Sequence, residues 1–419
     1  MFSRFDSDHL SLRDISNDID DKFGYDISKQ SLNDRFNEKT VDFLKLLIAD
    51  SLERKFKESY PSDFLNQFSS VLIQDSTSFQ LPSSLVKYYD GGGGNSTGSI
   101  IRIQFEYDMK QGRITQLEIT PGSLHDVVYA KNNIDKVKKN DLIIRDLGYV
   151  CNGISEQIIA NSAFFLNRLR SFQTAYIMNK HDHFEKLNFS QLYDRIKKNN
   201  LSCKEIEIYL GEKKQIKVRL IVELVPEDVY QKRIHKAGIK AKKNKRQLSN
   251  EYKSRARMNI FITNVPATII PLEKVRLVYS LRWQIELIFK SWKSIIGIAR
   301  IKKVKKERFE SQLLARLLLI IVTWQIFNVI NSHVQKLCNM NPISYQKFNK
   351  IIRNRLESLS FAIISGKRLV KEYMNSLLRI CLKKTHEIEA KKGKMSSIHT
   401  LKGLDQIPVY MESLKIIIA

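Results

Sequence analysis

Cysteine is scarce in this sequence of 419 residues, and its few copies are widely spaced. The four cysteines include no CxxC pair; they are Cys151, Cys203, Cys338 and Cys381. This spacing supports neither a zinc module with paired cysteines nor a disulfide framework. The cluster His181-Asp182-His183 could bind a metal in principle, but its polar surroundings favour a solvated loop.

Long apolar segments are also few. The first residues, MFSRFDSDHLSLRD, lack the apolar core of a secretory signal, so we expect an intracellular, cytoplasmic protein. The most apolar run, residues 313–330, is interrupted by Arg316, Gln325 and Asn328, which predicts a buried helix rather than a membrane span. The glycine run at 91–94 lacks the downstream Gly-Lys-Ser/Thr of a phosphate-binding P-loop, and we predict a mobile connector there.

Acidic residues are too few to balance the basic ones. Lysine and arginine number 70 and aspartate and glutamate 44, which leaves a formal net charge of +26. High net charge is typical of disordered chains when hydrophobic residues are few. Here the hydrophobic fraction is 43%, as in a globular protein, so we do not expect a disordered chain. So basic a chain attracts polyanions, and nucleic acid is favoured over a membrane surface as its partner.

The N-terminal region, residues 1–70, has helical patterns. A helix-turn-helix is one interpretation of residues 10–37, with Gly24 at the turn. The second helix would then carry polar residues able to contact DNA: Ser28, Lys29, Gln30, Asn33 and Arg35. A small helical bundle without DNA contacts would show the same pattern.

From residue 71 the pattern changes to short strands and helices. We expect a strand whose apolar run ends at Asp75 and a second strand that ends at Asp146. The other predicted elements are a hairpin of strands 100–108 and 114–120, helices at 124–140 and 155–170, and a strand at 171–178.

Residues 180–265 interrupt this layout with β-rich, strongly basic sequence. Segments 206–210 and 214–225 alternate as a hairpin does, and residues 259–265 form another expected strand. Lysine and arginine cluster between these strands, and we expect Lys242, Lys243, Lys245 and Arg246 to contact phosphate. A solvated face is the alternative interpretation of such a charge run.

One helix-length segment, YSLRWQIELIFKSWKS at residues 279–294, combines apolar and charged residues. On a helix with about 100° per residue, Tyr279, Arg282, Glu286 and Lys293 share one stripe with apolar residues on both sides. We expect this stripe to face a cleft or a ligand, and Gln284 and Ser291 to face solvent. A plain surface ion pair between Arg282 and Glu286 is the alternative.

Three carboxylates now stand out: Asp75, Asp146 and Glu286. Phosphodiester cleavage can use two divalent ions about 4 Å apart, held by carboxylates in an open site. Mg²⁺ prefers such oxygen ligands. Tyr279, Arg282 and Lys293 could then hold the phosphates that flank the scissile bond.

These residues resemble the signature of a known family, the DDE transposases of the insertion-sequence-four group. Its motif Y-x2-R-x3-E-x6-K is matched in every spacing by Tyr279, Arg282, Glu286 and Lys293. Asp75 in QDST and Asp146 in IIRDLGY resemble the two catalytic aspartates. The resemblance covers about residues 70–300. It implies an α/β fold with a ribonuclease H-like core, a mixed sheet with flanking helices, interrupted by a β-rich insertion between helical terminal regions.

The resemblance also implies an activity. Members hydrolyse DNA at transposon ends with two Mg²⁺ ions, for which Mn²⁺ may substitute, and then join the freed 3′-hydroxyl to target DNA. It implies double-stranded DNA as partner, a dimer on paired ends and a nucleoid location, and it adds Lys290 to the DNA-binding residues. Some relatives stack an aromatic residue on a flipped base during a hairpin step; here Phe261 or Tyr252 are candidates.

The expected organisation has five parts. They are a DNA-binding region at 1–70, core at 71–179, insertion at 180–265, core with the glutamate helix at 266–310, and a helical region at 311–419 for dimerisation. Two other functions stay open: a DNA-binding protein that has lost catalysis, and a related nuclease with the same fold that cuts without joining.

Overall fold

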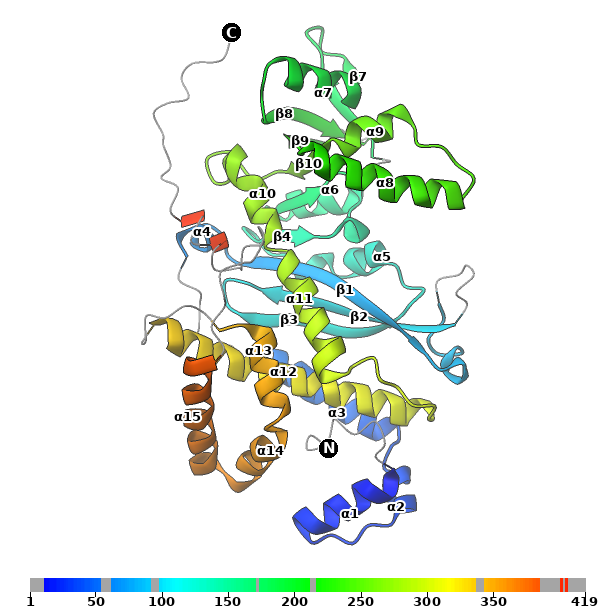
Figure 1. Cartoon of the computed structure of the whole chain (residues 1–419), viewed down its shortest axis with the longest axis vertical. Coiled ribbons are helices and arrows are strands. Elements are labelled where there is room, and N and C mark those ends of the chain that lie inside the picture. Colours follow the sequence, from blue (N-terminus) through cyan, green and yellow to red (C-terminus); the bar gives the residue numbers. More distant parts are fainter. Residues whose placement is uncertain are drawn as a thin grey trace. The chain divides into compact units, whose positions relative to one another are not determined.

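The chain forms two compact units in a computed structural model (Figure 1). The structure describes residues 11–53, 62–91, 98–170, 173–211, 216–336, 343–384, 400–401 and 404–405. The first unit contains residues 1–61, 75–125 and 283–399, and the second contains residues 62–74, 126–282 and 400–419. Most of the glycine connector, residues 92–97, and Cys338 lie outside the described residues, while Cys151, Cys203 and Cys381 are free thiols.

Three strands pair in parallel in the second unit, to which the first of them contributes its residues 71–74. Strand β1 (Val71–Leu81) pairs with β4 (Leu142–Arg145), and β4 pairs with β5 (Phe164–Arg168). The β4 residues are all buried, as expected for a strand covered on both faces. Helices α5 (Asp126–Asn132) and α6 (Asn152–Ala160) belong to the same unit.

An antiparallel hairpin belongs to the first unit. Strands β2 (Ser99–Asp108) and β3 (Arg113–Pro121) are joined by a turn in which Gly112 has φ 65°, a left-handed conformation that glycine adopts without strain. The strand order β3-β2-β1-β4-β5, with the first two antiparallel and the last three parallel, is that of a ribonuclease H-like core. The predicted α/β fold class is confirmed.

The helix predicted at 155–170 is wrong in its second half. Helix α6 ends at Ala160, and residues that we assigned to the helix form the core strand β5. Ser162, with φ 55°, makes the turn, and Phe165 and Leu166 are fully buried between β4 and β10 (Met258–Thr263). Burial on both faces overrides the helical pattern of this short apolar run.

The first strand also differs from its prediction. It does not end at Asp75 but continues to Leu81. Its parallel pairing with β4 nevertheless stops at Gln74, which lies opposite Arg145. The apolar run marks where this pairing ends rather than where the strand ends.

The expected insertion extends the same sheet. Beyond β5 the order continues β10-β9-β8-β6-β7, with β6 (Ala175–Met178), β7 (Phe184–Lys186), β8 (Cys203–Leu210) and β9 (Ile216–Leu224). These pairings are antiparallel. The helices are α7 (Phe189–Lys198), α8 (Glu227–Lys243), α9 (Asn250–Ala256) and α10 (Leu272–Ser280), so the basic run is largely helical.

The N-terminal helices contain the predicted turn. Helix α1 (Leu12–Phe23) starts with a capping box at Ser11 and ends at Gly24 in the left-handed conformation. Helix α2 (Lys29–Asp34) follows, then α3 (Glu38–Glu53) in the first unit and α4 (Asp63–Asn66) in the second. The two helices and the turn that the helix-turn-helix prediction needs are therefore present, with six residues in α2.

The C-terminal region of the first unit is helical, as predicted. After α11 (Trp283–Ser291) and a π-helical turn (Trp292–Ile296) come α12 (Lys306–Lys336), α13 (Tyr345–Arg353), α14 (Leu356–Ser365) and α15 (Lys367–Lys384). Among the described residues, Lys306–Gln335 alone is long and apolar enough to cross a membrane, and 67% of its apolar window is buried in the protein. The indole of Trp324 in α12 donates to the Gly112 carbonyl, as a core helix packed on the hairpin does.

Two short C-terminal pieces, residues 400–401 and 404–405, belong to the second unit. The buried Lys274 of α10 donates to the carbonyl oxygen of Leu404 at 2.6 Å. The carboxylate of Asp405 accepts hydrogen bonds from the Ser62 hydroxyl and the Phe64 amide, both at 3.0 Å, at the start of α4. Hydrogen bonds between chain segments far apart in sequence therefore help to hold this unit together.

Candidate active site

Asp146 lies in the second unit, directly after β4, where it meets an arginine. Its Oδ1 atom is 3.9 Å from Nε of Arg282, which follows α10. The Arg282 side chain is 15% exposed and that of Asp146 is 45% exposed, so the carboxylate remains accessible beside a largely buried guanidinium. Two of the predicted site residues are thus brought together.

Tyr279 joins this pair from the last turn of α10. Its ring packs against Phe261, with 5.2 Å between the centroids, and the Arg282 guanidinium carbon is 6.0 Å from the ring centroid. The Tyr279 hydroxyl is buried, and no group meets it at hydrogen-bonding geometry within the described structure. Burial raises the pKa of Tyr279 to about 12, a change that the neighbouring Arg282 and Arg168 oppose and Asp146 favours. The phenol therefore stays protonated and can donate at neutral pH.

The single helix expected over residues 279–294 is not present. Helix α10 ends at Ser280, and the amides of Leu281 and Arg282 bond to carbonyls three residues back, at Val278 and Tyr279. Helix α11 then starts at Trp283 and changes to a π-helical turn at Trp292. A uniform winding of 100° per residue was therefore wrong, because tight and wide turns replace it at both ends. Tyr279 and Arg282 belong to the second unit, and Glu286 and Lys293 to the first.

Glu286 and Lys293 are both exposed in the first unit, whereas Ser291 is fully buried. Our expectation of a walled-in stripe with Ser291 toward solvent was wrong for these positions. Ser291 accepts a hydrogen bond from Asn349 at 3.2 Å, which explains its burial. Exposure leaves the Glu286 carboxylate accessible to a ligand without the cost of burying its charge.

Lys293 is tied to the strand that carries Asp75. It stands in the π-helical turn, and its ammonium group donates to the carbonyl oxygen of Ser78 in β1 at 2.9 Å. Partial burial lowers the pKa of Lys293 from its ordinary value. The lysine is thereby held at a defined place along β1.

Asp75 is half-buried within β1, and its Oδ1 accepts a hydrogen bond from the Ser76 amide at 2.8 Å. The register between β1 and β4 ends with Gln74 opposite Arg145. The residues that directly follow this last pair are Asp75 and Asp146. Two separate sequence motifs thus begin at the point where one parallel pairing ends.

The three carboxylates have the chemistry that Mg²⁺ prefers, since all are accessible oxygen donors. Asp75 and Glu286 belong to the first unit and Asp146 to the second. Within the described residues, no three His, Cys, Asp or Glu side chains form a group that could hold a metal ion. His181 and His183 lie in the exposed turn between β6 and β7, as the solvated-loop interpretation predicted.

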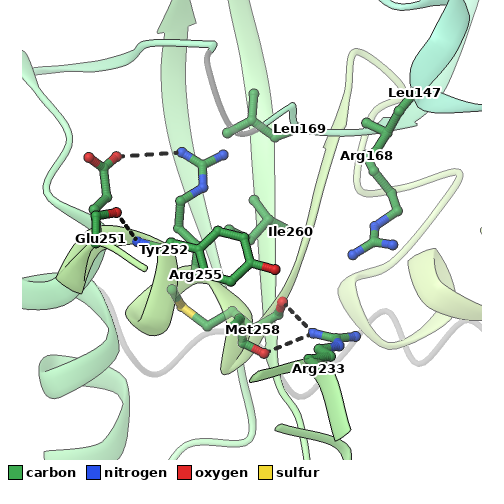
Figure 2. A pocket seen from close by; sticks show the side chains of 11 residues that line it. Leu147, Arg168, Leu169, Arg233, Glu251, Tyr252, Arg255, Met258 and Ile260 are labelled. Carbon is green, nitrogen blue, oxygen red and sulfur yellow. Dashed lines mark hydrogen bonds and ion pairs between the residues drawn. The ribbon is translucent and has the colours of Figure 1, made fainter. Parts of the chain in front are cut away.

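A pocket of about 410 Å³ in the second unit contains residues that sequence reasoning missed (Figure 2). Its lining includes Arg168 at the end of β5, Arg233 of α8, Arg255 of α9, and Tyr252. No hydrogen bond or ion pair holds the Arg168 side chain in the described structure, and its charge acts on both Arg233 and Tyr279. The erroneous helix at 155–170 concealed Arg168, because only a strand there makes Arg168 the last residue of a strand, next to the position that Asp146 takes after β4.

The other predicted DNA-binding residues lie at separate places. Lys242 and Lys243 end α8, and Lys245 and Arg246 follow it; all four are exposed. Lys290 is exposed in α11. Arg35 is exposed at the end of α2, where it donates to the hydroxyl and carbonyl oxygens of Ser31.

The fold is of the ribonuclease H-like class, and it carries Asp75 and Asp146 directly after the last β1–β4 pair together with the Y-x2-R-x3-E-x6-K residues. A family model, the transposase DDE domain, matches residues 66–322, which is more than half of the chain. The chain therefore belongs to the DDE transposases, which are enzymes that act on DNA.

Curated relatives agree with this family. The transposase for insertion sequence element IS231F of Bacillus thuringiensis subsp. israelensis is 32% identical over 308 residues, which cover 70% of this chain and 64% of the relative. The transposase for IS231E of B. thuringiensis subsp. finitimus is 30% identical, covering 87% and 80%. The transposase for IS1151 of Clostridium perfringens is 31% identical, covering 85% and 78%.

Proposed function

We propose that this transposase cleaves DNA at the ends of an insertion sequence and joins the freed 3′-hydroxyl ends to target DNA by cut and paste. The observation that carries the proposal is the coincidence of the β1–β4 register with the two aspartates, together with the intact signature that contains Glu286. The reaction needs an activated nucleophile and a stabilised leaving oxygen, and both needs are met by metal ions between carboxylates.

Asp75, Asp146 and Glu286 would hold two Mg²⁺ ions, for which Mn²⁺ can substitute. When bound, these ions polarise the phosphodiester and lower the pKa of the attacking water or 3′-hydroxyl. The exposure of Glu286 and the partial exposure of the two aspartates support this role, because a ligand from solvent can reach them. The Arg282–Asp146 ion pair places a positive charge beside one of these carboxylates before a metal binds.

Tyr279, Arg282 and Lys293 would bind the phosphates flanking the scissile bond, with Lys290 as a further contact. A protonated phenol with no partner for its hydroxyl has a donor left for an anion. Arg282 has a fork of donors, and Lys293 carries a point charge held near β1.

The pocket in Figure 2 is the place where a nucleotide extruded from the duplex would fit. Of the two aromatic candidates, Phe261 is 4% exposed and already packs against Tyr279, whereas Tyr252 is 38% exposed and lines the pocket. Stacking on an aromatic ring stabilises an extruded base. These contacts favour Tyr252 for a hairpin step.

DNA recognition and assembly complete the proposal. Residues 1–70 with Arg35 would read the terminal repeats, while Lys242, Lys243, Lys245 and Arg246 contact phosphates. Helices in residues 311–419 would bring two subunits together on paired ends. The catalytic core would consist of residues 71–179 and 266–310, and residues 180–265 would be its insertion. The relatives are bacterial, so the protein would act in the cytoplasm on nucleoid DNA.

The test is cleavage of a DNA fragment that carries the element's own ends. Wild type, Asp146→Asn and Glu286→Ala are compared with Mg²⁺, Mn²⁺ and EDTA. The proposal expects breaks at the ends that need a metal and vanish in both variants, while DNA binding persists. Equal binding by all three proteins without cutting would favour a silent DNA-binding protein, and cutting without joining would favour a plain nuclease.

A further inference from the structure

Helix α10, which carries Tyr279, is linked to the basic helix α8 through a chain of polar side chains. Arg276 of α10 donates to Oε1 of Glu223 in β9 at 2.8 Å. Oε2 of Glu223 accepts from the amide nitrogen of Asn259 in β10 at 2.9 Å. The amide oxygen of Asn259 accepts from Arg233 of α8 at 2.6 Å. Every member lies in the second unit.

The middle of this chain is fixed by the sheet. Asn259 lies directly opposite Glu223 in the antiparallel register of β10 and β9, so the two side chains share a face. Each oxygen of Glu223 has one donor, and the two ends of the Asn259 amide have opposite roles. The hydrogen-bond directions are therefore determined all along the chain.

Both ends of the chain reach functional elements. Arg276 is three residues before Tyr279, one turn along the same helix, so its position sets the rotation of that helix. At the other end, Arg233 also donates to the carbonyl oxygens of Ala256 and Met258 and lines the arginine-rich pocket. The same α8 carries Lys242 and Lys243 at its C-terminal end.

A second contact from β9 holds the start of α10. Arg219 donates to the carbonyl oxygens of Val265 and Ile270, in the loop before α10, at 2.6 and 3.0 Å. Arg219 and Glu223 are four residues apart on one strand and so point to the same face. The Arg276–Glu223 bond adds to this hold, and to the buried Lys274–Leu404 bond of the same helix, a contact from β9 one turn before Tyr279.

The Arg276–Glu223 bond contributes little to the free energy of folding. The Arg276 side chain is 67% exposed and that of Glu223 is 24% exposed. Exposed ion pairs contribute about 0–1 kcal/mol to folding. The orientation of a group that binds the reacting phosphate is much more sensitive, because small misplacements can cost a large factor in rate.

We propose that Glu223 and Asn259 are positioning residues that connect phosphate binding along α8 to the placement of Tyr279 and Arg282. An anion that draws Arg233 or α8 changes the Arg233–Asn259 bond, and the chain passes this change to α10. Neither residue touches the DNA. This inference rests on the proposed function.

A reciprocal exchange tests the chain. In Glu223→Gln, the new amide nitrogen faces the amide nitrogen of Asn259, and both groups are donors. If the Asn259 amide flips so that its oxygen accepts this bond, its nitrogen faces the guanidinium of Arg233 instead. One hydrogen bond of the chain is therefore lost in either arrangement. Asn259→Asp sets two carboxylates against each other. The double variant restores every bond, because the new glutamine donates to the new aspartate, which still accepts from Arg233. Each single variant should cleave about tenfold more slowly in single turnover, and the double variant should recover to within about threefold of wild type.

Glu185→Gln is the matched control. It makes the same chemical change in the edge strand β7, where Glu185 accepts a hydrogen bond from the side-chain nitrogen of Asn179 at 2.6 Å in an exposed contact. DNA affinity should be the same for all variants, and cleavage is compared at a temperature well below the lowest melting temperature of the set, so that the loss falls on the cleavage step. Single variants that cleave as fast as wild type would overturn the proposed positioning role. A double variant that cleaves no faster than the slower single variant would overturn it as well. Failure of wild type itself to cut would count against the proposed function instead.

Discussion

The buried hydroxyl of Tyr279 allows a substitution whose effects on stability and on catalysis have opposite signs. A buried polar group without a hydrogen-bond partner costs about 1–3 kcal/mol, and the Tyr279 hydroxyl is such a group in the DNA-free protein. Tyr279→Phe removes that cost and keeps the ring contact with Phe261. We expect the free energy of unfolding to rise by about 1 kcal/mol, or the melting temperature by about 2–4 °C.

Cleavage should respond in the opposite direction. If the phenol donates to a phosphate whose charge builds up in the reaction, its loss removes one preorganised donor, which typically costs a factor of about 10²–10³ in rate. Because Arg282 remains, we expect about a hundredfold loss in single-turnover cleavage with little change in DNA affinity. The assay is gel-based cleavage of an end-bearing fragment beside thermal unfolding of the free protein.

A matched control exists in the first unit. Tyr373 of α15 also has a buried hydroxyl without a hydrogen-bond partner, its pKa is likewise raised to about 12 by burial, and an arginine, Arg355, lies near its ring. Tyr373→Phe should give a similar gain in stability with no loss of cleavage. The reasoning is refuted if Tyr279→Phe destabilises the protein by 1 kcal/mol or more, or if it cleaves as fast as wild type.

Three further predictions concern charge. Burial lowers the pKa of Lys293, so cleavage should decline on the alkaline side before an ordinary lysine would lose its proton, and Lys293→Arg should move this decline to higher pH; an unchanged pH profile would contradict the role. Arg282→Gln removes the cation beside Asp146 and should strengthen Mn²⁺ binding by the free protein up to about fivefold, measured by calorimetry, while cleavage falls; weaker Mn²⁺ binding would count against it. Four basic residues can be replaced together with glutamine: Lys242, Lys243, Lys245 and Arg246. DNA affinity should then fall less steeply with salt, and the magnitude of the slope of log affinity against log salt should decrease by about 0.9 per lost phosphate contact. An unchanged slope would indicate that this run is only a solvated face.

The sequence predicted the fold class correctly, and an apolar run ending in aspartate indicated where parallel pairing stops. The motif residues were selected by their resemblance to a family signature, and their catalytic roles stay predictions. Sequence prediction failed at β5, because a buried five-residue strand has no periodicity that separates it from the helix before it. It failed again at Leu281 and Ser291, where local hydrogen bonding and packing against Asn349 decide the backbone path and burial.

Residues absent from any motif were the hardest to foresee. Arg168, Glu223 and Asn259 acquire meaning only through strand register and the elements packed around them. A linear pattern shows which residues are charged, but not which charges meet.

The contacts of Leu404 and Asp405 within the second unit affect how the chain folds during its synthesis. The contacts of Asp405 with Ser62 join residues 343 positions apart, and that of Leu404 with Lys274 joins residues 130 apart. On a ribosome, these contacts of the second unit can therefore form only after the helices of the first unit have been synthesised. Neither unit is continuous in sequence, so we expect folding to be completed late rather than domain by domain. A nascent chain stopped before residue 400 should be far more sensitive to protease than the full chain.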